Sequence, residues 1–244
     1  MLGTSELLFV AFLLVSLYFF IRPPQWLQSY RKRTFLSKEG GIFQGPDITN
    51  HVRTVGKQLI KQNNLEHLNI KFHVLRSWVP NGYALPTGEI YLTRGIFGIV
   101  DNDDELAAVL AHEIGHVAAQ HSVKKTRHAA KLMILSAALP VGLLGKVSDF
   151  MVKGVSSAHS QEHELEADAL SVEYLHKAGY DPMATYSSLR KLYELTETDD
   201  GKGNPFHEFL DTHPVSEVRL NTVLALAKGY SGVKASEQSP LKQT

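Results

Sequence analysis

The chain has 244 residues, with 25 basic and 25 acidic side chains, 12 histidines and no cysteine. This length allows one sizeable domain with appendages, and a hydrophobic content of 43% excludes a disordered polymer. A net charge of zero argues against a nucleic-acid partner. Without cysteine, the chain cannot form a disulfide scaffold, a thiolate zinc site or an iron–sulfur cluster. Any site for a soft metal must therefore use imidazole and carboxylate ligands.

The N-terminal segment is the most apolar part of the chain, because residues 7–21 are hydrophobic apart from Ser16. Together with residues 2–6, a helix here would span about 30 Å, enough for a bilayer core. No Lys or Arg precedes the segment, and no small-residue cleavage site follows it. We expect residues 1–21 to be an uncleaved single-pass anchor in membrane lipid.

The balanced charge hides an asymmetry between the two halves of the chain. Residues 1–100 carry 11 basic and 5 acidic side chains, which leaves 14 and 20 for residues 101–244. Under the positive-inside rule, the basic residues after the anchor place the C-terminal domain in the cytoplasm.

The remainder divides into a juxtamembrane linker (22–46), one domain (47–230) and a disordered tail (231–244). We expect an α+β domain that is mainly helical with a small sheet. A helix begins at Asp47, strands follow at 70–76 and 89–93, and Asn81-Gly82 indicates a turn between them.

The second half of the domain is predicted to be helical. Asn102 and Glu105 have the spacing of a capping box, which opens a long helix to about Lys125. The small, apolar stretch 129–145 is broken by proline and glycine, and we interpret it as a core helical hairpin. It could also cover the cleft or dip into a lipid interface. Further helices are expected at 161–178, after Asp181-Pro182 and after Pro214.

The long helix contains the sequence His112-Glu113-Ile114-Gly115-His116. Histidines at i and i+4 share one helix face, so both imidazoles can bind one metal ion. The glutamate next to the first histidine can deprotonate a water that a zinc ion activates. This pattern predicts a metallohydrolase with Glu113 as its general base.

A catalytic zinc ion needs a third protein ligand. His121 is a poor candidate, because five residues of regular helix turn it about 140° away from His116. The helix at 161–178 offers Glu164 as a ligand and Asp168, on the same face, as an acceptor for a ligand histidine. Spacing alone leaves Glu162 and Glu166 as competing carboxylates.

These motifs resemble the membrane-associated zinc metallopeptidases of family forty-eight, which are gluzincins. That family includes HtpX-type, CAAX prenyl, OMA-type and periplasmic proteases. Four stretches match in order over roughly residues 50–225, namely Asn81–Gly88, His112–His116, Glu164–Asp168, and Thr212-His213-Pro214 with Arg219. The family often has arginine where this chain has Gln161, so a charge role at that position does not carry over.

The resemblance implies a zincin-like fold and one Zn²⁺ per chain, held by His112, His116 and Glu164. It assigns Asp168 to the orientation of a ligand histidine. It also places His213 near the metal, where it could stabilise an oxyanion or cap the zinc in a resting state. Arg219 could position His213 or bind the substrate carbonyl.

Substrate binding is expected along the strand region between Asn81 and Thr93, through strand addition beside the metal helix. The residues that we expect to contact the peptide are Asn81, Ala84, Pro86 and Gly88.

The sequence thus predicts a membrane-anchored zinc metalloendopeptidase that acts on misfolded or membrane-proximal polypeptides. The alternative is a peptide-binding chaperone or assembly factor on the same fold. The side of the membrane stays open, because charge favours the cytoplasm whereas relatives in the family are often periplasmic. The sequence does not indicate an oligomeric state.

Overall fold

The computed structural model describes residues 11, 15, 18, 25–127, 160–197 and 207–237. The chain divides into two compact units, residues 1–38 with 122–157 and residues 39–121 with 158–244. In the first unit, α2 (Gln25–Lys38) is helical where the sequence analysis expects a linker. Most of the expected anchor and all of residues 129–145 lie outside the described residues. Among the helices that are described, none has the length and hydrophobicity needed to span a bilayer.

The second unit begins with α3 (Pro46–Gln62), whose apolar side chains follow the predicted helical spacing. Val52, Val55 and Leu59 are all buried in the main core. After the short 3-10 helix Glu66–Leu68, the chain enters a three-stranded sheet.

The sheet has the order β1-β3-β2, with β1 at Lys71–Leu75, β2 at Gly82–Ala84 and β3 at Glu89–Thr93. β1 and β3 are parallel, whereas β2 is antiparallel to β3 and forms an edge of the sheet. The Asn81-Gly82 pair, predicted to be a turn, instead leads into β2. Backbone pairing of Gly82 with Leu92 overrides its local turn preference.

α4 (Asp103–Ala118) begins at the predicted cap, where the Asn102 side chain accepts a hydrogen bond from the Glu105 N–H at 2.9 Å. The Glu105 carboxylate accepts in return from the Asp101 N–H at 2.9 Å. The helix ends seven residues before the predicted Lys125, because Gln120 adopts a left-handed conformation with φ of 55°. Residues 121–127 are helical again.

The remaining helices are α7 (Gln161–Ala178), α8 (Met183–Glu197), α9 (His207–Thr212) and α10 (Glu217–Glu237). α7 has the predicted bounds and ends at Gly179, whose φ is 82°. α10 continues through residues 231–237, which the sequence analysis assigns to a disordered tail. The two glycines near its end cost only about 1 kcal/mol each in a helix and do not end it.

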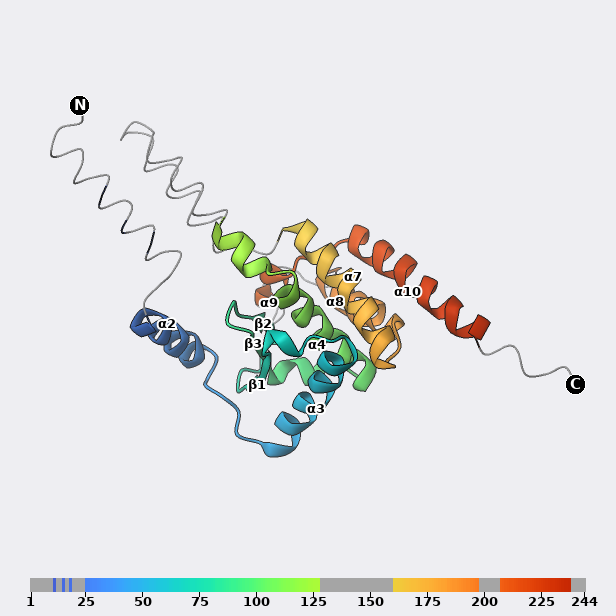
Figure 1. Ribbon diagram of the computed structural model, residues 1–244. Coiled ribbons are helices and arrows are strands. Elements are labelled where there is room, and N and C mark those ends of the chain that lie inside the picture. Colours follow the sequence, from blue (N-terminus) through green and yellow to red (C-terminus); the bar gives the residue numbers. More distant parts are fainter. Residues whose placement is uncertain are drawn as a thin grey trace, which may run out of the picture. The chain divides into compact units, whose positions relative to one another are not determined.

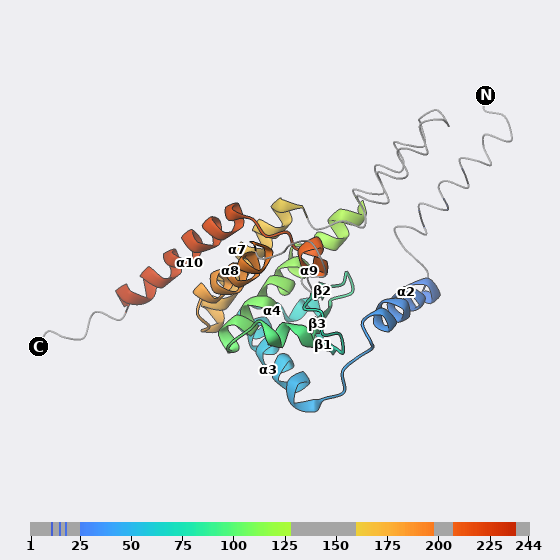
Figure 2. The same cartoon turned by 180° about the vertical axis from the view of Figure 1, so that it is seen from behind.

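The central packing contact of this unit joins α4 and α7, which lie side by side in Figures 1 and 2. A Cβ at Gly115 would lie only 3.2 Å from the Cα and the carbonyl oxygen of Ala167. A larger residue at position 115 would therefore separate the two helices. The sheet packs on the same assembly, with α3 against β1 and α4 against β2.

Candidate metal centre

α4 presents His112 and His116 on one face, as the i, i+4 spacing predicts. Their Nε2 atoms lie 3.0 Å apart. His116 is buried, and the side chain of His112 is 12% exposed. The glycine contact between α4 and α7 brings both imidazoles against the first turns of α7.

Glu164 of α7 supplies a third donor at matching distances. Its Oε2 lies 3.4 Å from His112 Nε2, and its Oε1 lies 3.3 Å from His116 Nε2. Zinc bonds of 2.0–2.1 Å in a tetrahedral site place neighbouring donors about 3.3–3.4 Å apart. The spacing and chemistry of these three residues therefore fit a zinc ion.

His213, which follows α9, completes a group of four potential donors with His112, His116 and Glu164. Its Nδ1 lies 3.4 Å from His112 Nε2 and 3.3 Å from each Glu164 oxygen. Its other nitrogen, Nε2, lies 3.6 Å from Glu113 Oε1. The ring thus stands between the three predicted ligands and the predicted general base.

Asp168 and Arg219 lie behind the donor group. His112 Nδ1 is 3.0 Å from Asp168 Oδ1, as expected for a carboxylate that orients a ligand histidine. Arg219 donates two hydrogen bonds to Asp168, at 2.7 and 2.8 Å. It also lies 2.8 Å from Glu164 Oε2 and donates to the Pro214 carbonyl at 2.8 Å. With 2% of its surface exposed, Arg219 holds carboxylates and the His213 loop in place.

Electrostatic interactions in this cluster oppose the effect of burial. Burial lowers the pKa of His112, but the hydrogen bonds that its ring donates to Asp168 and Glu164 raise it to about 10. Burial likewise raises the pKa of Glu164, yet the charge of His213 and hydrogen bonds from the histidines lower it strongly overall. The carboxylate of Asp168 also has a lowered pKa, since the Arg219 hydrogen bonds outweigh burial. The carboxylates of Glu164 and Asp168 are therefore held ionised, whereas His112 must release a proton before its Nε2 can bind a metal.

Glu113 lies in a different environment from the other carboxylates. It is 1% exposed, and burial raises its pKa, although the charges of His213 and His112 oppose this effect. Within the described residues, its Oε2 atom is buried without a hydrogen-bond partner. A carboxylate with a raised pKa beside a metal site is well suited to accept and return a proton.

The sequence analysis names four candidate residues for substrate binding, and they occupy two different places. Asn81 is buried immediately before β2, where its Oδ1 accepts hydrogen bonds from the Gly82 N–H and the Thr212 hydroxyl. Ala84 lies in β2 itself. Pro86 and Gly88 belong to the turn between β2 and β3, in which Gly88 has a φ of 81° and donates to the Leu85 carbonyl. The conformation of the turn explains why proline and glycine occur at these two positions, and no contact with a substrate is needed to explain them.

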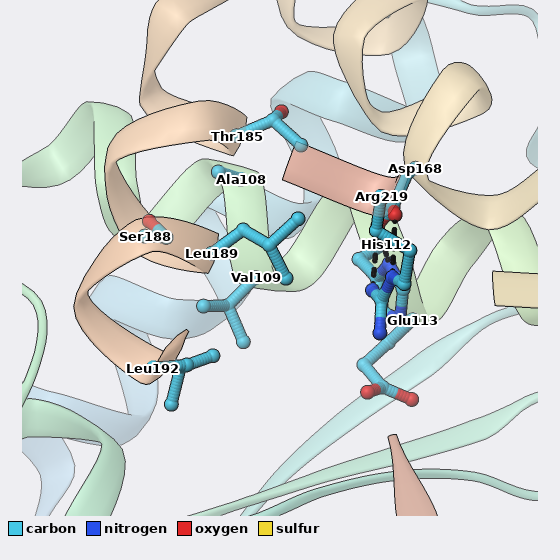
Figure 3. A pocket seen from close by; sticks show the side chains of 10 residues that line it. All are labelled: Ala108, Val109, His112, Glu113, Asp168, Thr185, Ser188, Leu189, Leu192 and Arg219. Atoms are coloured by element: carbon cyan, nitrogen blue, oxygen red, sulfur yellow. Dashed lines mark hydrogen bonds and ion pairs between the residues drawn. The ribbon is translucent and has the colours of Figure 1, made fainter. Parts of the chain in front are cut away.

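A small, mainly apolar pocket adjoins the metal centre between α4 and α8. Figure 3 shows His112, Asp168 and Arg219 joined on one side and the aliphatic side chains on the other. The aliphatic wall consists of Val109, Leu189 and Leu192. The sequence analysis missed this pocket, because the residues that α4 and α8 contribute to it are more than 70 positions apart in the chain.

The chain also matches known proteins over the region that builds this centre. The model of peptidase family M48 matches residues 46–227. The chain belongs to peptidase family M48. M48 metalloproteases use zinc, which agrees with the donor set.

Several curated M48 proteins are similar to this chain. It is 32% identical over 178 residues to the mitochondrial metalloendopeptidase OMA1 of Schizosaccharomyces pombe, covering 72% of this chain and 52% of that protein. It is 28% identical over 193 residues to the beta-barrel assembly-enhancing protease of Escherichia coli K12, covering 73% of this chain and 39% of that protein. It is 31% identical over 169 residues to the metalloprotease LoiP of Escherichia coli K12, covering 66% of this chain and 64% of that protein. The chain thus spans about half or less of the first two relatives.

The sequence analysis expected His121 to point away from His116, whereas the structure places it against this residue. Its Nδ1 lies 2.8 Å from Nδ1 of His116, although a regular helix would turn it away. The left-handed Gln120 breaks that regularity, and no pattern in the sequence marks glutamine for such a conformation.

Proposed function

We propose that this chain is a zinc metalloendopeptidase in which His112, His116 and Glu164 hold the metal. The observation that carries the proposal is the convergence of their donor atoms, whose closest separations are 3.0–3.4 Å, with Glu113 buried beside them. When bound, zinc polarises the scissile carbonyl and lowers the pKa of water at the site.

The chemistry assigned to this chain's own residues is proton transfer and charge stabilisation. Glu113 accepts the proton of the attacking water and passes it to the leaving amine nitrogen. His213 occupies a fourth donor position, which we interpret as a resting-state cap. Once displaced by substrate, its ring stays close enough to stabilise the developing oxyanion.

Two features support binding of an extended polypeptide. β2 is an edge strand in contact with the metal helix, and edge strands accept peptides through backbone hydrogen bonds. The pocket lined by Val109, Leu189 and Leu192 offers an apolar subsite beside the metal. We infer that Ala84 contacts the peptide backbone and that the buried Asn81 holds the start of this strand in place, whereas Pro86 and Gly88 shape the turn.

We further propose that residues 1–21 anchor the protein in a membrane and that its substrates are misfolded or membrane-proximal proteins. The apolar segment 7–21, in which Ser16 is the one polar exception, supports the anchor. The relatives' names, which include a mitochondrial metalloendopeptidase and a beta-barrel assembly-enhancing protease, support a role in protein quality control. Nothing specific to this site favours a chaperone without turnover.

The Glu113→Gln variant tests the proposed function, because glutamine keeps the shape of the side chain but cannot accept the proton. Purified wild-type protein should cleave casein. The variant should retain one zinc ion per chain and lose at least about 10²-fold in kcat/KM. Casein cleavage at the wild-type rate by the pure variant would overturn the assignment.

A further inference from the structure

His121 contacts the metal centre from outside the group of four donors. It is fully buried, and its Nδ1 lies 2.8 Å from Nδ1 of His116. Its Nε2 lies 3.0 Å from Oε2 of Glu166, whose side chain is 48% exposed. The three side chains form a continuous line from the donor group to the protein surface.

The backbone is specifically arranged to make this contact. Gln120 has a φ of 55°, a conformation that costs a non-glycine residue about 1–2 kcal/mol. The resulting break at the end of α4 returns His121 to the His116 side of the helix. The ring of His163 stacks on His121, with centroids 4.3 Å apart and planes inclined by 18°. His121 is thereby fixed both in position and in ring plane.

The directions of the hydrogen bonds follow from the position of the donor group. His116 directs Nε2 toward His112 and Glu164, so its proton resides on Nδ1 when Nε2 binds a metal. The Nδ1–H of His116 then donates to Nδ1 of His121. The proton of His121 consequently resides on Nε2 and donates to Glu166.

The two ligand histidines are therefore supported in different ways. His112 reaches the carboxylate of Asp168 directly, at 3.0 Å. His116 reaches the carboxylate of Glu166 through a second imidazole. Groups that orient a metal-binding histidine typically change metal affinity or activity 10–100-fold when removed.

We propose that His121 is a positioning residue that fixes the tautomer and ring orientation of the zinc ligand His116, and that Glu166 orients His121 in turn. This inference rests on the proposed ligand role of His116. It assigns a function to Glu166 that is distinct from the metal-ligand role considered for it from sequence.

The first test compares His121→Phe with His121→Asn in the full chain. Asparagine can place an acceptor oxygen near the position of Nδ1, whereas phenylalanine keeps a ring against His163 but leaves the His116 Nδ1–H without its acceptor. Zinc affinity is measured by chelator competition, and ligand geometry by the visible spectrum of the Co²⁺-substituted protein. We expect about 10–100-fold weaker zinc binding and a shifted cobalt spectrum for phenylalanine, with partial or full recovery for asparagine. Wild-type affinity and spectrum in the phenylalanine variant would overturn the proposal.

A second comparison remains decisive even where a buried substitution prevents folding. Glu166→Ala removes an exposed carboxylate, and Glu162→Ala removes another exposed carboxylate one turn earlier on the same helix. Both variants lose one negative charge, and only the Glu166 variant should weaken zinc binding more than this shared loss of charge does. Equal weakening of zinc binding in both variants would refute the proposed role of Glu166. A wild-type chain that binds zinc but does not cleave casein would refute the proposed function and leave this comparison intact.

Discussion

The contact between Gly82 and Glu113 gives a sharp test of the proposed general base. A Cβ added at Gly82 would lie 2.6 Å from Oε1 and 3.0 Å from Cδ of Glu113. Ordinary contact begins near 3.4 Å, so in Gly82→Ala the carboxylate must retreat by about 0.8 Å. None of the atoms within 3.3 Å of this Cβ belongs to a predicted zinc ligand.

A displacement of about 1 Å at a reacting group typically costs 10²-fold in rate. We therefore expect kcat/KM of Gly82→Ala to fall by about 30–100-fold, or ~2–3 kcal/mol of transition-state stabilisation. Zinc content should remain at one per chain. Casein cleavage and atomic absorption measure the two quantities on the same protein preparation.

Gly98→Ala is the matched control, because a Cβ at Gly98 has no atom within 4 Å. Its activity should equal that of the wild type. Cleavage by Gly82→Ala within about threefold of the wild-type rate, with zinc bound, would show that catalysis does not depend on the position of this carboxylate.

Three further outcomes are expected. Arg219→Met should lower the free energy of unfolding by about 3–5 kcal/mol in urea titrations, because it leaves two buried carboxylates without their guanidinium. The control Arg190→Met breaks an exposed ion pair and should lower the free energy of unfolding by at most about 1 kcal/mol. Burial raises the pKa of Glu105, but hydrogen bonds from Lys191, the Asp101 N–H and the Ser187 hydroxyl lower it below 4.5 overall. The ionised carboxylate therefore stabilises the fold above that pH, and this contribution is lost as the pH falls through the lowered pKa. The deficit of Glu105→Gln should be about 1–3 kcal/mol at pH 7 and shrink as the pH falls below 4.5, whereas a pH-independent deficit would contradict the argument. Chelation of zinc should lower the melting temperature, and added Zn²⁺ should restore it in proportion to RT ln(1 + [Zn]/Kd).

Features that depend on neighbouring residues were predictable from the sequence. His112 and His116 share a face because they are four residues apart in a helix, and the Asn102 cap lies where its spacing with Glu105 indicates. The bounds of α7 follow from a capping serine and a terminal glycine. The family resemblance selected Glu164 among three carboxylates on that helix, and the donor distances agree with this selection.

Features that depend on tertiary contacts were not predictable. β2 forms because β3 lies beside it, although Asn81-Gly82 has a strong local preference for a turn. His121 reaches His116 because packing holds Gln120 in a conformation that glutamine rarely adopts. The apolar pocket depends on how α8 lies against α4, which no periodicity encodes. In each case a long-range contact outweighs the local signal.

The buried charges around the metal centre nearly balance when zinc is included. Glu113, Glu164 and Asp168 are each at most 1% exposed, and Arg219 is the buried cation beside them. When all three carboxylates are ionised, they and the guanidinium carry a net charge of −2, which a divalent ion would neutralise. Without the ion, protonation of His112 offsets part of this negative charge, consistent with its pKa of about 10. Metal binding at His112 would therefore release a proton, and the buried carboxylates favour a divalent ion through their charge as well as through their ligand type.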